Sequence, residues 1–216
     1  MNEADRERFI RAQTVLDRVA LVPEVALYTA TSLSPLWAAT ESTLDAAEME
    51  PPFWAFAWSG GQALARYLID EPSAVAGARV LDFATGSGLV AIAAHLAGAS
   101  QVTATDIDPL ACTAARINAA VAGFALEVVS TDLVGGALPE IDVVLAGDVF
   151  YDRAASRRFD PWFRQLAAAG KRVLVGDPGR AYLPADLEQL AVFEVPVAFE
   201  IESRKAMQTR ILRYKS

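Results

Sequence analysis

The run at residues 80–88, Val-Leu-Asp-Phe-Ala-Thr-Gly-Ser-Gly, constrains this chain more than any other stretch. Its apolar start and closing acid predict a buried strand, and the alanine-rich residues 89–97 after it predict a helix. The turn between them lets the backbone approach a ligand closely, because Gly86 and Gly88 have no Cβ. No Lys follows the loop, and Ala84 stands where a dinucleotide fingerprint has its first Gly, so neither phosphate-binding loop fits well.

The alternation of strand and helix continues along the chain and predicts an α/β fold with a mostly parallel sheet. Apolar runs such as residues 141–146 are typical of parallel strands that are buried on both faces. A C-terminal pair of antiparallel strands is expected to end the fold. We expect strands at residues 80–82, 101–106, 125–130, 141–146, 171–176, 192–201 and 209–214, and helices at 60–70, 89–97, 110–121, 157–168 and 183–190.

The N-terminal part reads differently from the rest. Residues 3–20 carry apolar side chains at helical spacing, and residues 21–50 have no clear pattern. We therefore divide the chain into an N-terminal helical extension, residues 1–50, packed on the core, and a main domain, residues 51–216. A chain of 216 residues fits this organisation.

Composition excludes several classes of protein. One cysteine, Cys112, cannot form an intramolecular disulfide. The single histidine, His95, argues against a multi-histidine metal site and a Ser-His-Asp triad, and we expect it to be structural. The net charge of −8 argues against a general grip on nucleic acid, although Arg153, Arg157 and Arg158 form a small basic cluster. The charged N-terminus and the lack of a long apolar run predict a cytoplasmic protein without a membrane span.

Acidic residues follow four of the predicted strands. Ligands of open α/β sheets bind outside the carboxyl ends of the strands, so Asp82, Asp106, Asp132 and Asp148 are expected to converge on one site. Asp106 is placed to accept the two hydroxyls of a ribose. Asp108, before a proline, reads as a helix N-cap. Asp132 either contacts a base or serves as a turn residue.

Four aromatic residues, Phe53, Trp54, Phe56 and Trp58, stand within six positions just before the predicted helix at residues 60–70. They are either a hydrophobic plug under the sheet or a wall of the ligand pocket. A wall of this kind would favour a bound cation by roughly 0.5–2 kcal/mol, because the face of an aromatic ring attracts positive charge.

Together these features resemble the class I methyltransferases that use S-adenosylmethionine. The acid and closely spaced glycines of residues 82–88 look like the first motif of that family, with Ala84 a departure from the usual Gly. The resemblance implies a Rossmann-like, seven-stranded sheet with one reversed strand and helices on both faces. It also implies cofactor contacts from Trp58, Asp82, Ala84, Gly86, Gly88, Asp106, Ile107, Asp132 and Leu133.

The sequence Asp-Val-Phe-Tyr at residues 148–151 resembles the acid-x-x-aromatic motif of the protein-lysine branch of that family. Methyl transfer to lysine requires an uncharged amine held in line with the methyl group. A carboxylate or phenol can orient the amine or pass its proton to water, so Asp148 and Tyr151 are the predicted catalytic residues. The alternative is that Asp148 only caps the next helix. Arg180 faces either the substrate or the solvent.

Four stretches, residues 52–62, 81–88, 147–152 and 176–180, resemble the lysine methyltransferase family that acts on the electron transfer flavoprotein beta subunit, with a likeness over about residues 10–215. That family implies a flavoprotein partner, no metal, no nucleic acid and no membrane. Two alternatives remain. One is a methyltransferase of a ribosomal protein, of nucleic acid or of a small amine such as nicotinamide; the other is a non-catalytic or nicotinamide-binding Rossmann protein.

Overall fold

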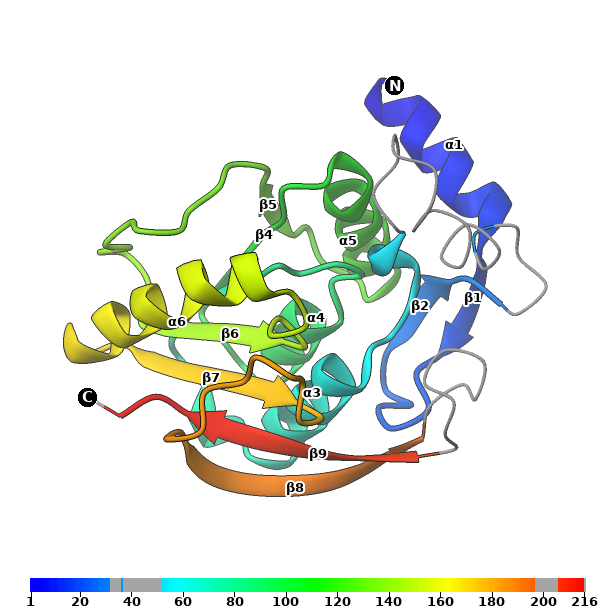
Figure 1. The fold of residues 1–216 in the computed structure, drawn as a ribbon. Coiled ribbons are helices and arrows are strands. Elements are labelled where there is room, and N and C mark those ends of the chain that lie inside the picture. The colour runs from blue at the N-terminus through cyan, green and yellow to red at the C-terminus, as the bar shows by residue number, and fades with distance from the viewer. Residues whose placement is uncertain (32–35, 37–51, 197–205, 216) are drawn as a thin grey trace.

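The computed structural model describes residues 1–31, 36, 52–196 and 206–215, and most of them form one seven-stranded sheet with helices on both faces (Figure 1). The strands lie in the order β5-β4-β3-β6-β7-β9-β8. The first five are parallel, and β9 is antiparallel to both of its neighbours, as predicted. The strands are β3 (Arg79–Phe83), β4 (Gln101–Thr105), β5 (Glu127–Val129), β6 (Val143–Gly147), β7 (Arg172–Asp177), β8 (Glu188–Pro196) and β9 (Ala206–Arg213).

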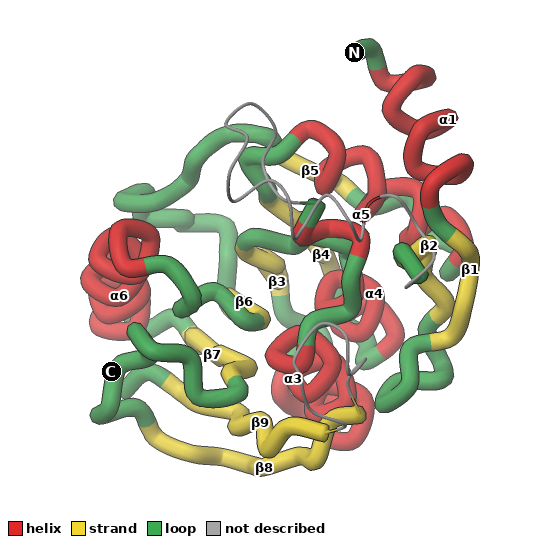
Figure 2. Tube along the Cα trace, turned by 45° about the vertical axis from the view of Figure 1, so that its right-hand side comes forward, coloured by secondary structure: helices red, strands yellow, loops and turns green. Residues whose placement is uncertain are grey.

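The central strands place alternate side chains on opposite faces of the sheet. In β6, Val143 and Leu145 join the apolar cluster that includes α3 (Ser59–Asp70) and α4 (Leu89–Leu96). Val144 and Ala146 join the second cluster, which includes α6 (Arg153–Ala168). Figure 2 shows β6 and β7 between α6 and α3. Burial on both faces is the reason that these strands read as continuous apolar runs.

Three glycines, Gly60, Gly147 and Gly176, bring α3 against the ends of β6 and β7. A Cβ on Gly60 would lie 2.3 Å from the carbonyl oxygen of Gly176, and one on Gly147 would lie 2.8 Å from the Cα of Gly61. Contacts this short leave no room for a side chain, so the first turn of α3 rests directly on the strand ends. The same contact places the N-terminus of α3 next to Asp148, which follows β6.

The N-terminal segment is partly helical and partly a hairpin. Helix α1 spans Glu3–Gln13, and β1 (Val15–Arg18) and β2 (Ala26–Thr29) form a two-stranded antiparallel sheet. The predicted helix over residues 3–20 was therefore too long, because a stripe of apolar residues does not mark where the helix stops. Val22 and Leu27 belong to the same apolar cluster as α3 and α4. The division of the chain into an extension and a main domain stays a prediction. The proposed boundary at residue 50 lies outside the described residues.

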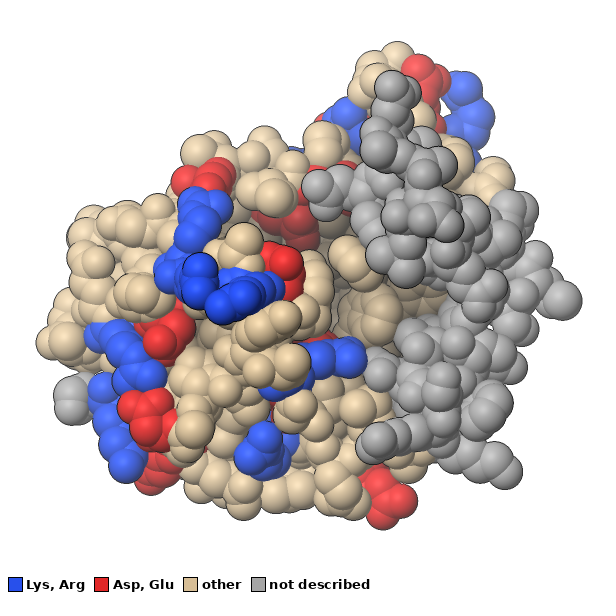
Figure 3. All heavy atoms as spheres, in the orientation of Figure 1, with Lys and Arg blue, Asp and Glu red and all other residues tan. Residues whose placement is uncertain are grey.

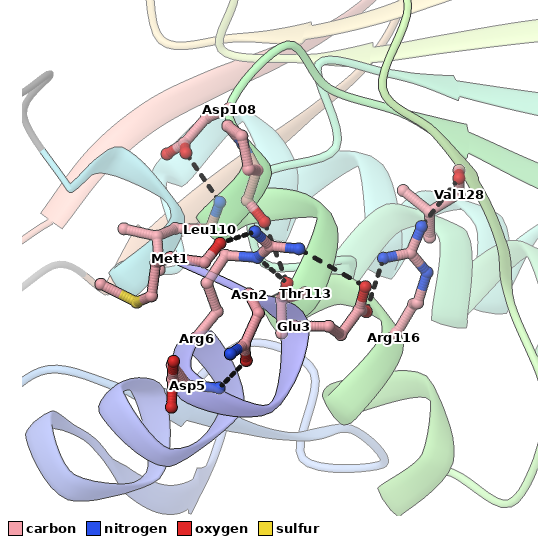
Figure 4. Close-up of polar contacts among 11 residues, drawn as sticks. Met1, Asn2, Glu3, Asp5, Arg6, Asp108, Leu110, Thr113, Arg116 and Val128 are labelled. Atoms are coloured by element: carbon pink, nitrogen blue, oxygen red, sulfur yellow. Dashed lines mark hydrogen bonds and ion pairs between the residues drawn. The ribbon is translucent and has the colours of Figure 1, made fainter.

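Polar contacts attach α1 to α5 (Pro109–Val121), as Figure 4 shows. The Nε of Arg6 donates to the hydroxyl of Thr113 at 3.0 Å. Arg116 pairs with Glu3 at 2.9 Å and donates to the backbone of the adjoining strand. The apolar part of this contact is made by Ile10, which is fully buried. Helix α1 therefore covers the outer side of α5, the helix that follows Asp108.

The predicted helix at residues 183–190 was wrong, because residues 183–187 are not helical and β8 begins at Glu188. The last strands pair over Glu188–Pro196 and Ala206–Arg213. Parts of the unassigned segment 21–50, the end of the expected strand 192–201 and most of the connection 202–208 lie outside the described residues. Across the described ranges, no helix is long and apolar enough to cross a membrane.

Candidate active site

A cavity of about 750 Å³ opens at the carboxyl ends of β3, β4 and β6, and the segment at residues 53–58 forms its opposite wall. The four strand-end acids that were expected to converge all line it. The predicted site residues on its wall are Trp58, Asp82, Ala84, Gly86, Asp106, Ile107, Asp132, Leu133, Asp148 and Tyr151.

Backbone conformation and packing explain the small residues of the loop between β3 and α4. Gly86 and Gly88 have positive φ angles of 53° and 84°, and Gly88 caps α4. A Cβ on Gly88 would lie 3.0 Å from the Cα of Ala115 in α5, so this glycine is required by packing and is not brought to the cavity wall. Ala84 also has a positive φ, 53°, which costs an L-residue about 1–2 kcal/mol. The backbone strain that a glycine would relieve is therefore retained beside the cavity.

Asp82 is almost fully buried and lacks a cationic partner among the described residues. Its Oδ2 accepts from the Thr85 hydroxyl at 2.5 Å and from the backbone N–H of Ala91 at 3.0 Å. Burial raises the pKa of this carboxyl to about 7, and the nearby Asp106 acts in the same direction. Asp82 thus retains acceptor capacity at the cavity wall but resists ionisation.

Asp106 joins the two neighbouring loops. Its Oδ2 accepts from the backbone N–H of Gly86 at 2.9 Å, and its Oδ1 accepts from that of Asp108 at 3.0 Å. Burial raises the pKa of the Asp106 carboxyl. Asp108 caps α5 by accepting from the N–H of Leu110, as predicted. Ile107 lies between these acids, is 69% exposed, and presents apolar surface at the cavity.

Asp132 is a turn residue that also lines the cavity. Its Oδ1 accepts from the backbone N–H of Val134, as in a turn, and the side chain lines the cavity beside Leu133. Its Oδ2 pairs with Arg158 at 2.5 Å, and this hydrogen bond lowers the pKa of the Asp132 carboxyl. Figure 3 shows basic and acidic side chains adjacent to one another over α6, so the arginines of this region lie among acids.

Asp148 is held more tightly than any of the other three. Its φ of 60° is in the left-handed region, and its N–H donates to the carbonyl of Gly176. Its carboxylate accepts from Arg180 twice, Nε to Oδ1 at 2.6 Å and a terminal nitrogen to Oδ2 at 3.1 Å. The N–H of Gly60 donates to Oδ2 at 3.2 Å. Asp148 does not cap the next helix; that role belongs to Asp152.

Arg180 and the start of α3 were not identified as site residues from the sequence. The Oδ1 of the buried Asp177 accepts from the backbone N–H groups of Gly179 and Arg180, which fixes the loop after β7. Burial raises the pKa of the Asp177 carboxyl to about 6. One feature of the sequence could have pointed to Arg180: Asp-Pro-Gly-Arg, residues 177–180, follows a predicted strand at the end where ligands bind. The partner, Asp148, could not be read from spacing.

The aromatic segment serves as both plug and wall. Trp54 and Phe56 are buried and also reach the cavity. Phe53 lies at the opening, where its ring is 5.3 Å from that of Tyr151 and 5.8 Å from that of Trp58. The Nε1 of Trp58 donates to the carbonyl of Phe53 at 2.8 Å, which orients the indole. Tyr151 is 53% exposed, so its phenol stands at the mouth of the cavity.

The two single residues are outside this wall. His95 is exposed and stacks on Phe124 with ring centroids 3.9 Å apart, which agrees with a structural role. Cys112 is buried in α5, and its thiol donates to the carbonyl of Asp106.

Comparison with known proteins identifies the type of site. The family model of ribosomal protein L11 methyltransferase (PrmA) matches residues 63–148. The electron transfer flavoprotein beta subunit lysine methyltransferase of Danio rerio is 37% identical over 99% of this chain and 84% of that protein. The protein of the same name from Rattus norvegicus is 35% identical over 82% of this chain and 71% of its own length.

The solved structures agree on the fold. The magnesium protoporphyrin IX methyltransferase of Synechocystis, solved with S-adenosylmethionine bound, has a TM-score of 0.51 and 21% identity over 72% of this chain and 78% of that one. The chain therefore has the fold of S-adenosylmethionine-dependent methyltransferases.

Proposed function

The chain belongs to the family of electron transfer flavoprotein beta subunit lysine methyltransferases, and from this premise we propose that it transfers methyl groups from S-adenosylmethionine to lysine side chains of that flavoprotein subunit. One observation carries the proposal: a single cavity is lined by the strand-end acids, by several aromatic residues and by the Asp148–Arg180 pair. The likeness to relatives over nearly the whole chain supports the substrate as well as the chemistry.

The residues at the β3 and β4 ends fit S-adenosylmethionine. Asp106 has carboxylate lone pairs left for ribose hydroxyls, because each of its oxygens is used by one backbone N–H. Asp82 and the strained loop around Ala84 and Gly86 offer acceptors and close backbone approach to an amino-acid group. Ile107 and Leu133 supply apolar surface for a flat base. The bound cofactor would supply an electrophilic methyl group on a sulfonium.

The other end of the cavity fits the amine. Asp148 Oδ1 accepts one bond, from Arg180, and can accept a second from a substrate N–H. That bond would aim the nitrogen lone pair away from the carboxylate, towards the interior of the cavity. Tyr151, at the mouth, can orient the amine or pass its proton to water. Phe53 and Trp58 would exclude water from the methylene stem of the lysine.

Methylation of a ribosomal protein is the second candidate, because the L11 methyltransferase model matches this chain. That match is confined to residues 63–148 and omits Trp58, Tyr151 and Arg180, so it describes the cofactor half. Nicotinamide or another small amine is an alternative substrate, since its methylation would use the same chemistry. The cytoplasmic location and the absence of a metal from the reaction stay predictions.

The test uses purified wild-type enzyme, labelled S-adenosylmethionine and four acceptors: unmethylated electron transfer flavoprotein, its isolated beta subunit, ribosomal protein L11 and nicotinamide. We expect label on lysines of the beta subunit, located by mass spectrometry. A beta subunit with its lysines blocked by acetylation is the control. Label on L11 or on nicotinamide, with none on the flavoprotein, would replace the proposal.

A further inference from the structure

The cavity wall at the transfer end contains an ion pair whose cation, Arg180, takes no part of its own in the reaction described above. Arg180 and Asp148 form a two-point contact, and their side chains are 22% and 5% exposed. The guanidinium also stands over the ring of Trp58, 5.9 Å from its centroid. Such a pair costs desolvation energy, so its presence at a reacting site calls for a function beyond stability.

The chemistry of the substrate indicates what that function is. Lysine enters from water as an ammonium and must become an uncharged amine before it can accept a methyl group. An unpaired Asp148 would hold the ammonium and make its proton harder to lose. Paired with Arg180, the carboxylate is electrically balanced yet still has an acceptor position on Oδ1.

We propose that Arg180 is a positioning residue that cancels the charge of Asp148, so that Asp148 orients the target amine without trapping it as an ammonium. The inference rests on the proposed function, since it concerns the lysine bound at that site. Arg180 acts through Asp148 and is not itself required to touch the amine.

The remaining charges on the cavity wall are consistent with this local role. Asp82, Asp106 and Asp108 lie at the ends of β3 and β4, bound to backbone N–H or hydroxyl groups. Asp132 is paired with Arg158, and Asp152 caps α6. Within the described part of the wall, Asp148 is thus the acid at the end of β6, and Arg180 is the cation paired with it.

The arginine is held in place from behind. Asp177 is fully buried and accepts from the N–H of Arg180 at 2.7 Å. Asp148 in turn donates its N–H to Gly176, so the ends of β6 and β7 are tied together. The geometry of the pair is therefore set by two adjacent strands and not by a mobile surface side chain.

Two variants test the proposal with the purified enzyme and its protein acceptor. Arg180→Gln keeps a hydrogen-bond donor and removes the charge, and Arg180→Lys keeps the charge. We expect the acid limb of the pH profile of kcat to move up by about one pH unit in Arg180→Gln, the size expected for an uncancelled charge near the amine, and to stay in place in Arg180→Lys.

A second readout needs no proton transfer. Tetramethylammonium, a permanent cation, should inhibit Arg180→Gln about tenfold more strongly than the wild type, in competition with the protein acceptor. If both variants keep the wild-type acid limb and the wild-type inhibition, the charge of Arg180 has no such role. If both lose turnover equally with neither readout shifted, Arg180 is merely structural.

Folding and function are controlled separately. If Arg180→Gln melts below the assay temperature, Arg180→Ala is assayed with and without free guanidinium, which should return the acid limb towards the wild-type position; a limb that guanidinium leaves unmoved contradicts the proposal. Wild-type turnover on the flavoprotein tests the proposed function by itself. A wild-type enzyme that does not methylate the flavoprotein would contradict the proposed function. Arg180 variants whose acid limb does not shift would contradict only the role of Arg180.

Discussion

The two ends of the cavity carry the same type of residue in equivalent places but in opposite electrostatic settings. Asp82, near the end of β3, and Asp106, just after β4, are bound by N–H and hydroxyl groups, and burial raises the pKa of each. Asp148, after β6, is bound by an arginine. The position at a strand end brings a carboxylate to the site. Its hydrogen-bond partners then decide its electrostatic setting: N–H and hydroxyl groups at Asp82 and Asp106, and an arginine at Asp148.

The largest effect should come from breaking the transfer end. Asp148→Asn is expected to lower kcat by at least about a thousandfold, because the amine loses the acceptor that orients it. Cofactor affinity, measured by calorimetry, should stay within about twofold of wild type. Retained turnover would remove Asp148 from the mechanism, and a matched loss of cofactor binding would show that the two ends are not separable.

At the cofactor end, the raised pKa of Asp82 should make the free energy of unfolding depend on pH. The pKa of Asp82 is about 7 in the folded protein, above its ordinary value near 3.9, so the folded state binds more protons between these pH values. The contribution of Asp82 to the free energy of unfolding therefore falls as pH rises from about 4 to about 7. Asp82→Asn should remove that slope, at most about 4 kcal/mol, when urea unfolding of both proteins is compared across this range.

The packing that places Asp148 can be tested with two adjacent glycines. Gly60→Ala would drive a methyl group into the backbone of Gly176, with an expected loss of about 3 kcal/mol in the free energy of unfolding. Gly61→Ala is the matched control, because a Cβ there meets side-chain atoms only at 3.9 Å. Equal stability of the two variants would mean that α3 moves away from the strand ends at little cost.

Asp106→Ala should weaken cofactor binding by roughly 1.5–3 kcal/mol, the usual range for hydrogen bonds to a charged group. Turnover at saturating cofactor should change little, since the residue lies at the opposite end from the amine. Calorimetric titration with S-adenosylmethionine and with S-adenosylhomocysteine measures the change. Unchanged affinity for both would refute the ribose role.

The smallest effect is expected from the exposed pair of Asp132 and Arg158, whose side chains are 45% and 56% exposed. Arg158→Gln should alter the free energy of unfolding by less than about 1 kcal/mol, because water screens such pairs. The same measurement in high salt should shrink the difference further. A larger loss would show that the Asp132–Arg158 pair stabilises the fold in spite of its exposure.

Much of the fold could be predicted from the sequence, and so could most of the predicted site residues' position at one cavity. The strands were predicted because burial on both faces produces continuous apolar runs, as in β6. The acids converge because parallel strands end on one edge, a rule that needs only Asp82, Asp106 and Asp148 to be placed on strands. The length of α1 and the start of β8 were missed, because local pattern does not show where tertiary pairing takes over.

What the sequence determined by itself is local: the small-residue loop after β3, the N-cap at Asp108, and the aromatic segment before α3. What only the tertiary structure decided is the choice of partners across loops far apart in the chain. Arg180 meets Asp148 because β6 and β7 are neighbours in register. Gly60 reaches Asp148 because three glycines remove the side chains between α3 and the sheet. Pairing of this kind depends on which backbones approach one another, and no spacing along the chain encodes that directly.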